Sequence, residues 1–199
     1  MALDYGYECQ IAPQGTLIAG VDEVGRGALA GPVVAAAVIL DPNRVPYGLD
    51  DSKRLSPARR AALFDIILRD ALGVALAAIP ASMIDTLNIR HASLLAMTRA
   101  VGGLVLAPDL VLVDGRDLPT SLDRPALAII GGDGKAASIA AASIIAKVSR
   151  DRQMQRLALA FPQYGFERHV GYGTRLHQEM LSQHGITVLH RRTFMNGRS

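Results

Sequence analysis

Residues 16–27, which read TLIAGVDEVGRG, decide the fold of this 199-residue chain. Residues 16–21 form a short apolar run of the β type, which predicts a buried strand. The strand ends in the acidic pair Asp22-Glu23, and a turn that contains Gly25 and Gly27 follows directly. Because ligands of α/β proteins bind in the crevice beyond such strand ends, we expect the functional site to begin here.

The rest of the chain alternates between strand-like and helix-like runs. Residues 32–40 are nearly all Val, Ile, Leu and Ala, and a tight connection joins them to residues 16–21, so this pair is predicted to be antiparallel. Ser56 followed by Pro57 predicts the start of a helix that extends to about residue 72. Further strands are predicted at residues 73–79, 110–113 and 126–130, and further helices at residues 82–106, with a break near Gly102-Gly103, at residues 136–155 and at residues 177–183. This order of elements predicts a mixed sheet flanked by helices.

Length and composition indicate one domain with a small appendage. The residues are 50% hydrophobic and 20% charged, which is enough to bury one core and excludes a disordered chain. We divide the chain into an N-terminal segment (residues 1–15), an α/β domain (residues 16–160) and a C-terminal loop and helix region (residues 161–199) that completes the site.

Cysteine usage and hydropathy exclude further classes of protein. The single cysteine, Cys9, excludes a disulfide framework and a cysteine-rich zinc site, and it favours a reducing compartment such as the cytoplasm. The first 14 residues contain no Lys or Arg, so they do not resemble a signal peptide. The longest apolar run, residues 28–40, is too short to cross a bilayer, and no membrane partner is expected.

Charge is distributed unevenly along the chain. Residues 150–199 contain 8 Lys and Arg against 3 Asp and Glu, whereas residues 1–149 contain 13 against 15. A mildly acidic body with a basic C-terminal quarter suggests a polyanionic partner, although a solvated basic surface would give the same pattern.

Three of the predicted strands are followed by carboxylates, namely Asp22 with Glu23, then Asp114, then Asp133. Strand ends meet at one edge of an α/β sheet, where four carboxylates would repel one another strongly unless cations lay between them. Oxygen ligands favour hard ions such as Mg²⁺ or Mn²⁺, and two such ions about 4 Å apart form the clamp used for in-line phosphodiester cleavage. The pattern therefore predicts a metal site, although single acids after strands are also common turn formers and helix caps.

Other kinds of site fit the sequence less well. A relaxed dinucleotide-binding pattern begins at Gly25, but the 13 residues between Gly27 and Asp41 leave no room for the helix that this pattern requires. No P-loop and no Gly-x-Ser-x-Gly elbow occurs. His169 and His177 could be metal ligands, but such residues more often line a polar loop or contact phosphate.

Several blocks of the sequence resemble the motifs of the ribonuclease HII family, in the order in which that family carries them. The opening block is GVDEVGRG at residues 20–27, with AGPVV at residues 30–34 behind it. The later blocks are DSKRL at residues 51–55, VDG at 113–115, GDGK at 132–135 with residues 138–147, Arg150-Asp151, and GYGT at 171–174 with His177. The resemblance covers roughly residues 16–195, and it departs from the family at Ala28, where proline is frequent.

The resemblance implies an RNase H-like fold, with a central mixed five-stranded sheet flanked by helices and a small helical C-terminal region. It also implies a cytoplasmic, metal-dependent endoribonuclease that removes ribonucleotides from DNA during replication and repair. Such an enzyme cuts the RNA strand of RNA–DNA hybrids and nicks duplex DNA 5′ of single ribonucleotides, leaving 5′-phosphate and 3′-hydroxyl ends. The catalytic and metal-binding carboxylates would be Asp22, Glu23, Asp114 and Asp133, with two Mn²⁺ or Mg²⁺ ions when substrate is bound.

The same resemblance implies which residues bind the substrate. In that family a Gly-Arg-Gly turn reads the 2′-hydroxyl at the RNA–DNA junction, and a tyrosine stacks on the neighbouring sugar. The matching residues here are Gly25, Arg26, Gly27 and Tyr172, and Ser52 and Lys53 are expected to hold backbone phosphates. The implied partners are RNA–DNA hybrid and ribonucleotide-containing duplex DNA, and the protein is expected to be a monomer.

Two other classes of function remain open on the sequence alone. One is a nucleic-acid-binding protein of this fold without catalytic activity, against which the complete set of four acids argues. The other is a different two-metal nuclease of the same fold, against which the glycine turn and Tyr172 argue. The choice of substrate would separate these alternatives.

Overall fold

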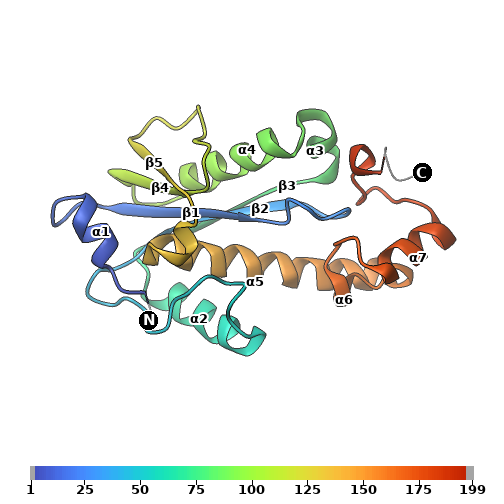
Figure 1. Ribbon diagram of the computed structural model, residues 1–199, viewed down its shortest axis with the longest axis horizontal. Helices are drawn as coiled ribbons and strands as arrows, with labels where there is room; N and C mark the ends of the chain where they lie inside the picture. The colour runs from blue at the N-terminus through green and yellow to red at the C-terminus, as the bar shows by residue number, and fades with distance from the viewer. Residues whose placement is uncertain (1–2, 196–199) are drawn as a thin grey trace.

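The computed structural model describes residues 3–195 as a five-stranded sheet with helices on both faces (Figure 1). The strand order is β3-β2-β1-β4-β5, where the strands are β1 Ile18–Val24, β2 Val33–Ile39, β3 Gly73–Ile79, β4 Leu110–Asp114 and β5 Ala126–Ile129. β2 pairs antiparallel with β1 and β3, whereas β4 pairs parallel with β1 and β5. The predicted mixed five-stranded sheet and its antiparallel first pair are therefore confirmed. Residues 1–2 and 196–199, the outermost parts of the predicted N-terminal segment and C-terminal region, lie outside the described residues.

The helices form a layer on each face of the sheet and a small group beyond one end. They are α1 Gly6–Ile11, α2 Pro57–Asp70, α3 Ala81–Leu87, α4 Ile89–Gly102, α5 Ala137–Ala160, α6 Phe166–His169 and α7 Arg175–His184, with short 3₁₀ turns at η1 Gly132–Gly134, η2 Pro162–Tyr164 and η3 Arg192–Phe194. α3 and α4 cover one face and α2 and α5 the other, while α6 and α7 lie at the far end of α5 (Figure 1). Within residues 3–195, no helix is both long and apolar enough to span a lipid bilayer.

Alternation of side chains along the central strands divides the core into two layers. Val21, Ala35 and Ala37 pack against α4, whereas Ala36 and Val38 pack against α2 and α5. Every residue of β2 is buried, because helices cover both of its faces. The central strands are thus held from both sides, which fixes the positions of the side chains at their ends.

Helix α5 lies close to β1, and a glycine permits this approach. A Cβ atom on Gly20 would collide with the backbone of Ser138 in the first turn of α5. The three consecutive alanines at positions 140–142 are fully buried and allow the helix to pack tightly against the sheet. This packing brings η1, which directly precedes α5, to the part of β1 that carries Asp22.

Two helices end where the sequence did not predict. The expected single helix over residues 82–106 is two helices, because an unpredicted break lies at Asn88, whereas the second helix ends at Gly102, where the break near Gly102-Gly103 was predicted. Asn88 has a φ of 64°, and its side chain accepts a hydrogen bond from the His91 amide, so it ends α3 and caps α4. α5 continues to Ala160, beyond the predicted end near residue 155.

The N-terminal segment contains α1, a helix that the sequence did not predict. Glu8 on this helix is fully buried, and its Oε1 accepts hydrogen bonds of 2.8 Å from both the amide and the hydroxyl of Ser138. The carboxyl group therefore caps the N-terminus of α5 from a distant part of the chain.

The C-terminal region returns to the connection between β1 and β2. The Gly31 amide donates to the Leu189 carbonyl at 2.8 Å, and the Arg191 amide donates to the Leu29 carbonyl at 2.9 Å. An isolated antiparallel bridge pairs Ala30 with residue 190 between these two bonds. The last part of the described chain is thereby fixed beside the turn that follows β1.

Candidate active site

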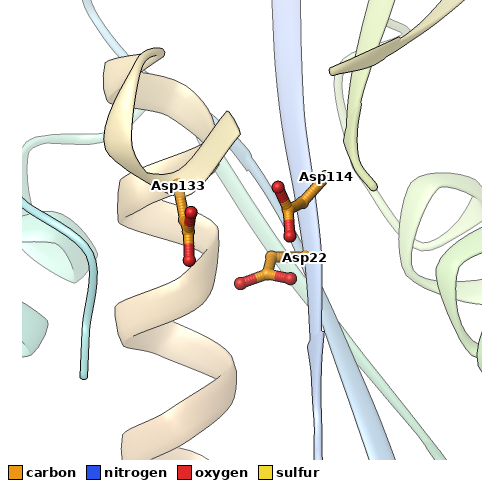
Figure 2. Close-up of side chains that lie close together, drawn as sticks. All are labelled: Asp22, Asp114 and Asp133. Atoms are coloured by element: carbon orange, nitrogen blue, oxygen red, sulfur yellow. The ribbon is translucent and has the colours of Figure 1, made fainter. Parts of the chain in front are cut away.

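Three aspartates from different elements converge beside β1 (Figure 2). β1 and β4 are parallel with Val21 opposite Val113, so the next residue along each strand, Asp22 or Asp114, lies beside the other. Asp133 comes from η1, between β5 and α5. One carboxylate oxygen from each of the three aspartates lies within 4.8 Å of the other two. The structure thus brings together three of the four acids that the sequence singled out.

Glu23, the fourth of these acids, points to the opposite face of β1, as alternation along a strand requires. Its Oε1 accepts a hydrogen bond of 2.9 Å from the Arg26 guanidinium. Together with Asp114, it lines a hollow of about 130 Å³ on the α4 side of the sheet. Glu23 therefore adjoins the aspartate cluster without belonging to it in this conformation.

Basic side chains surround the hollow beside Glu23. Arg26, Arg90 and Arg116 line it, and Arg90 makes two hydrogen bonds of 2.8 and 2.9 Å to Asp117. Arg116 forms no ion pair with any residue between 3 and 195. Guanidinium groups beside the acids offer donors for phosphate oxygens, and sequence reasoning had not singled out Arg90 or Arg116.

Burial and mutual repulsion raise the pKa values of the clustered acids. For Asp22, burial is the largest cause, the neighbouring Glu23 and Asp114 add to it, and hydrogen bonds from the Ser143 hydroxyl and the Glu23 amide partly offset it. Burial and the charge of Asp133 raise the pKa of Asp114, and burial raises the pKa of Glu23 despite its ion pair. The charged cluster is unfavourable by itself, so a cation placed within it would be bound favourably.

Lys53 supplies one cation at this cluster. Its ammonium nitrogen lies 3.1 Å from Asp133 Oδ2 and 3.7 Å from Asp51 Oδ1. Burial is the largest single effect and disfavours the charged amine, but the hydrogen bond to Asp133 and the charges of Asp133, Asp51 and Asp22 together outweigh it and raise the pKa of Lys53. Ser52 differs from its neighbour, because it is buried and its hydroxyl lies 2.8 Å from the Ser143 hydroxyl. Of the two residues expected to hold phosphates, Lys53 is the one with an exposed side chain.

The donor set of the aspartate cluster fits a hard divalent cation. Its ligand atoms are all carboxylate oxygens, which favour Mg²⁺ or Mn²⁺ over Zn²⁺. His169 and His177, the other residues considered as ligands, instead make hydrogen bonds to backbone carbonyls, of 2.8 Å to Tyr164 and 3.0 Å to Tyr172. These histidines therefore support the C-terminal region, and the metal site that the residues can form is the acidic one.

The turn formed by Gly25, Arg26 and Gly27 follows β1 directly. Gly25 has a φ of 90°, and a Cβ atom there would collide with the Arg150 side chain, so the fold itself requires this glycine. Gly27 differs, because apart from Gly27 and its two chain neighbours no heavy atom of the described chain lies within 4 Å of the place where its Cβ would be. The open space at Gly27 is available to a ligand that approaches the backbone closely.

Tyr172 lies near this turn because the backbone before it is fixed there. The Gly171 carbonyl accepts hydrogen bonds from the amides of Leu29 and Ala30, at 2.8 and 3.2 Å. The guanidinium carbon of Arg150 lies 5.5 Å from the centroid of the Tyr172 ring. Since the same Arg150 side chain lies against Gly25, the structure brings the predicted tyrosine close to the predicted turn.

Two fully buried arginines, Arg150 and Arg191, belong to this region and were missed in the sequence. Their guanidinium groups donate to backbone carbonyls, Arg150 to those of Ala30, Pro32 and Val170, and Arg191 to those of Gly25, Arg26 and Gly31. In the sequence, Arg150 stood in a block that resembles the family but had no role assigned to it, and Arg191 only added to the positive charge of residues 150–199. A charge count does not separate buried from exposed guanidinium groups, and carbonyl partners leave no signal in the sequence.

Comparison with known sequences identifies close relatives. The family model described as Ribonuclease HII matches residues 19–197 of the chain. Proteins named Ribonuclease HII from Brucella ovis and Brucella melitensis biotype 2 are each 54% identical to the chain over 196 residues. Each of these matches covers 98% of this chain and 89% of the relative.

Solved structures show the same fold. The ribonuclease H2 from Pyrococcus horikoshii OT3 has a TM-score of 0.76 and 26% identity, with 91% of this chain and 95% of that chain covered. A chain of the PCNA:RNase HII complex from Archaeoglobus fulgidus has a TM-score of 0.73 and 27% identity, with 88% and 94% covered. The expected RNase H-like fold is confirmed, and the chain belongs to the ribonuclease HII family and is an endoribonuclease of the ribonuclease H type.

Proposed function

We propose that the protein cuts the RNA strand of RNA–DNA hybrids and nicks duplex DNA on the 5′ side of single ribonucleotides, leaving 5′-phosphate and 3′-hydroxyl ends. The observation that carries this proposal is the convergence of Asp22, Asp114 and Asp133 directly beside the turn at residues 25–27. A hydrolytic centre thus adjoins backbone that a ligand can approach closely. In the cytoplasm, this activity would remove ribonucleotides from DNA during replication and repair.

We assign the metal site to Asp22, Glu23, Asp114 and Asp133, and its ions to Mg²⁺ or Mn²⁺, two of them when substrate is bound. When bound, such ions lower the pKa of water and stabilise the charge on the departing oxygen. The carboxylates hold the cations at the end of a rigid strand pair. Lys53, whose side chain is 77% exposed, can then turn from Asp133 toward a backbone phosphate.

Selection of the substrate depends on the 2′-hydroxyl, which distinguishes RNA from DNA at a given position. The backbone of Gly25, Arg26 and Gly27 approaches this hydroxyl, and the Tyr172 ring stacks on the neighbouring sugar. Arg116 at the hollow beside Glu23 adds a phosphate contact, and such contacts position a duplex without reading its sequence. Ser52 acts through its hydrogen bond to Ser143 rather than by touching the substrate.

The test is cleavage of a DNA duplex that contains one ribonucleotide, beside an all-DNA duplex of identical sequence, each with Mg²⁺, Mn²⁺ or a chelator. We expect one metal-dependent nick on the 5′ side of the ribonucleotide and an intact all-DNA duplex. Equal cutting of both duplexes would contradict the role of the turn. Binding without cutting under any metal would leave a nucleic-acid-binding protein and contradict the proposal.

A further inference from the structure

We propose that residues 187–191, which we call the C-terminal strap, position both elements that recognise the substrate. Arg191 fixes the turn at residues 25–27, and His190 fixes Tyr172. The backbone at Arg191 is extended, with φ −85° and ψ 101°, so adjacent side chains point to opposite sides of the strap. The inference rests on the proposed function, because it concerns how that same site recognises a ribonucleotide.

The Arg191 guanidinium is bound to both ends of the connection between β1 and β2. It donates to the Gly25 and Arg26 carbonyls at 2.7 Å each, and to the Gly31 carbonyl at 2.9 and 3.1 Å. The planar group presents its donors in a rigid fork, so these three carbonyls are held in a fixed arrangement. Arg191 therefore sets the conformation of the turn from beneath.

This arrangement also orients the backbone amides of the turn. In a planar trans peptide, the carbonyl of one residue and the amide of the next point in opposite directions. Because the Gly25 and Arg26 carbonyls point inward to Arg191, the amides of Arg26 and Gly27 point outward. Neither amide has a hydrogen-bond acceptor among residues 3–195, so both are available to a substrate hydroxyl or phosphate.

Within the described chain Arg191 forms no ion pair, and the charge of Asp85 acts on it more weakly than burial and Arg150 do. Arg191 is fully buried and all its hydrogen bonds go to carbonyls, as do those of the nearby Arg150. Burial, with repulsion from Arg150, lowers the pKa of Arg191 to about 10, so it stays charged at neutral pH. Two buried cations beneath the turn therefore favour a polyanion above it.

The second side of the strap is a chain of hydrogen bonds that ends at Tyr172. The Thr187 amide donates to His190 Nδ1 at 2.9 Å, His190 Nε2 lies 3.1 Å from His177 Nε2, and His177 Nδ1 lies 3.0 Å from the Tyr172 carbonyl. Since His190 Nδ1 accepts, its proton is on Nε2 and is donated to His177. His177 then carries its proton on Nδ1 and donates it to Tyr172. Each donor meets an acceptor only with both rings neutral and in these tautomers.

The strap is thus a set of positioning residues, and its effect is measurable apart from stability. We would use the Asp22→Asn protein with Mg²⁺, which we expect to bind with little cutting, and compare its affinity for a duplex with one ribonucleotide and for the all-DNA duplex. Arg191→Lys keeps the charge but not the fork, and Arg192→Lys is the control on the adjacent exposed arginine. We expect Arg191→Lys to lower the preference for the ribonucleotide duplex about fivefold to tenfold, as loss of one or two oriented donors implies.

Three outcomes of this comparison are decisive. A preference that falls in Arg191→Lys but not in Arg192→Lys, in a protein that still melts cooperatively, supports the inference. An unchanged preference in Arg191→Lys overturns it while leaving the proposed function intact. Equal affinity of the Asp22→Asn parent for both duplexes would overturn the proposed function, and the inference with it.

The histidine side of the strap is tested by a double-mutant cycle. His190→Gln should slow cutting at a single ribonucleotide in the parent protein, and should have no further effect in the Tyr172→Ala protein. Arg191→Lys should slow both proteins, because it acts on the other element. His184→Gln, at an exposed histidine of the same region, is the control. Equal effects of His190→Gln with and without the Tyr172 ring would contradict the inference.

The tautomers can be measured on the unaltered protein, so this test does not depend on how any variant folds. Long-range ¹H–¹⁵N correlation spectra at pH 7 should show the proton of His177 on Nδ1 and that of His190 on Nε2. The opposite tautomer at either ring, or a charged imidazolium, would overturn the hydrogen-bonded link to Tyr172.

Discussion

At the scale of single residues, function and stability make opposite demands on Asp22. The side chain is 5% exposed and lies beside two other acids, and burial raises its pKa well above the usual value. The folded protein therefore binds the proton more tightly than the unfolded chain does, and stability falls as the pH rises from about 3.8 toward the folded-state pKa. Above that range the metal-free protein carries the full cost of the charged group.

Asp22→Asn removes this cost with little change in size. We expect the metal-free variant to melt at a higher temperature at pH 7–8, by about 2–4 °C for each kcal/mol recovered. Cleavage should fall by at least about 100-fold, more than changes in the outer shell of a metal site produce. Calorimetry with a chelator and a nicking assay measure the two effects, and Asp65→Asn on the exposed face of α2 is the control. If the metal-free variant melted at a lower temperature than the parent, this would contradict the conclusion that the charged Asp22 destabilises the metal-free protein.

Tyr172 is the residue whose proposed role depends on a ring alone. Tyr172→Ala should slow cutting at a single ribonucleotide by about fivefold to 150-fold, if stacking on the sugar contributes the roughly 1–3 kcal/mol that stacking of a base on an aromatic ring does. Tyr172→Phe keeps the ring and should retain most of the rate. Both rates are measured by single-turnover nicking, with thermal melting as the check on folding. Equal rates for the Ala and Phe variants would remove the ring from the site.

At the scale of elements, the sheet could be predicted and the short or strained pieces could not. Apart from Asp22, the buried residues of β1 and β2 are apolar or glycine, and such runs are recognisable in one sequence. α1 has six residues, too few to show a helical period, and it is held in place by the buried Glu8 together with Tyr7 and Ile11, which pack against the core. The break between α3 and α4 depends on a positive φ at Asn88, which the sequence did not indicate, whereas the glycine pair at residues 102–103 correctly marked the end of α4.

The contact between α1 and α5 can be tested through Glu8. Glu8→Ala leaves the amide and hydroxyl of Ser138 buried without an acceptor, at a cost of about 1–3 kcal/mol, or roughly 2–12 °C in melting temperature. Glu8→Gln keeps an acceptor oxygen and removes a carboxyl whose pKa is raised by burial. Its melting temperature should therefore fall less than that of Glu8→Ala. Thermal melting at pH 7 separates the two, with Asp4→Asn as the control outside the buried contact. An equal fall in melting temperature for Glu8→Ala and Glu8→Gln would contradict the role of Glu8 as a cap of α5.

At the scale of the whole molecule, the buried acids and the buried His190 change the stability of the fold in opposite directions as the pH changes. Burial and the neighbouring His177 lower the pKa of His190 from 6.5 to about 4. Because the unfolded chain binds this proton more tightly, the contribution of His190 is complete above pH 6.5 and is lost as the pH falls toward 4. The C-terminal region should therefore loosen in acid while the aspartate cluster becomes less costly.

Comparison with His190→Gln isolates this contribution. The difference in unfolding free energy between the parent and the variant should be largest above pH 6.5 and should shrink steadily toward pH 4. Denaturant titrations at several pH values measure it, with His184→Gln as the control. A difference that stays constant across this range would show that His190 does not titrate with the lowered pKa.

The site as a whole was predictable to the extent that strand ends and family motifs define it. Asp22 and Asp114 lie near the ends of the buried strands β1 and β4, and Asp133 follows the edge strand β5, so their convergence follows from the topology of the sheet. The support beneath the turn was not predictable, because Arg191 contacts backbone carbonyls about 160 positions away in the sequence. The basic C-terminal quarter was interpreted as a surface for a polyanion, whereas Arg150 and Arg191 within it are buried.

The distance along the chain between Arg191 and Gly25, 166 residues, has a consequence for biosynthesis. The ribosome completes the five strands of the sheet, and with them the three aspartates, well before it adds residues 187–191. A nascent chain can therefore assemble its acidic centre while the turn at residues 25–27 still lacks the guanidinium that holds it. If Arg191 positions the turn as proposed, discrimination between RNA and DNA would be completed only after residues 187–191 have left the ribosome and packed beside the turn.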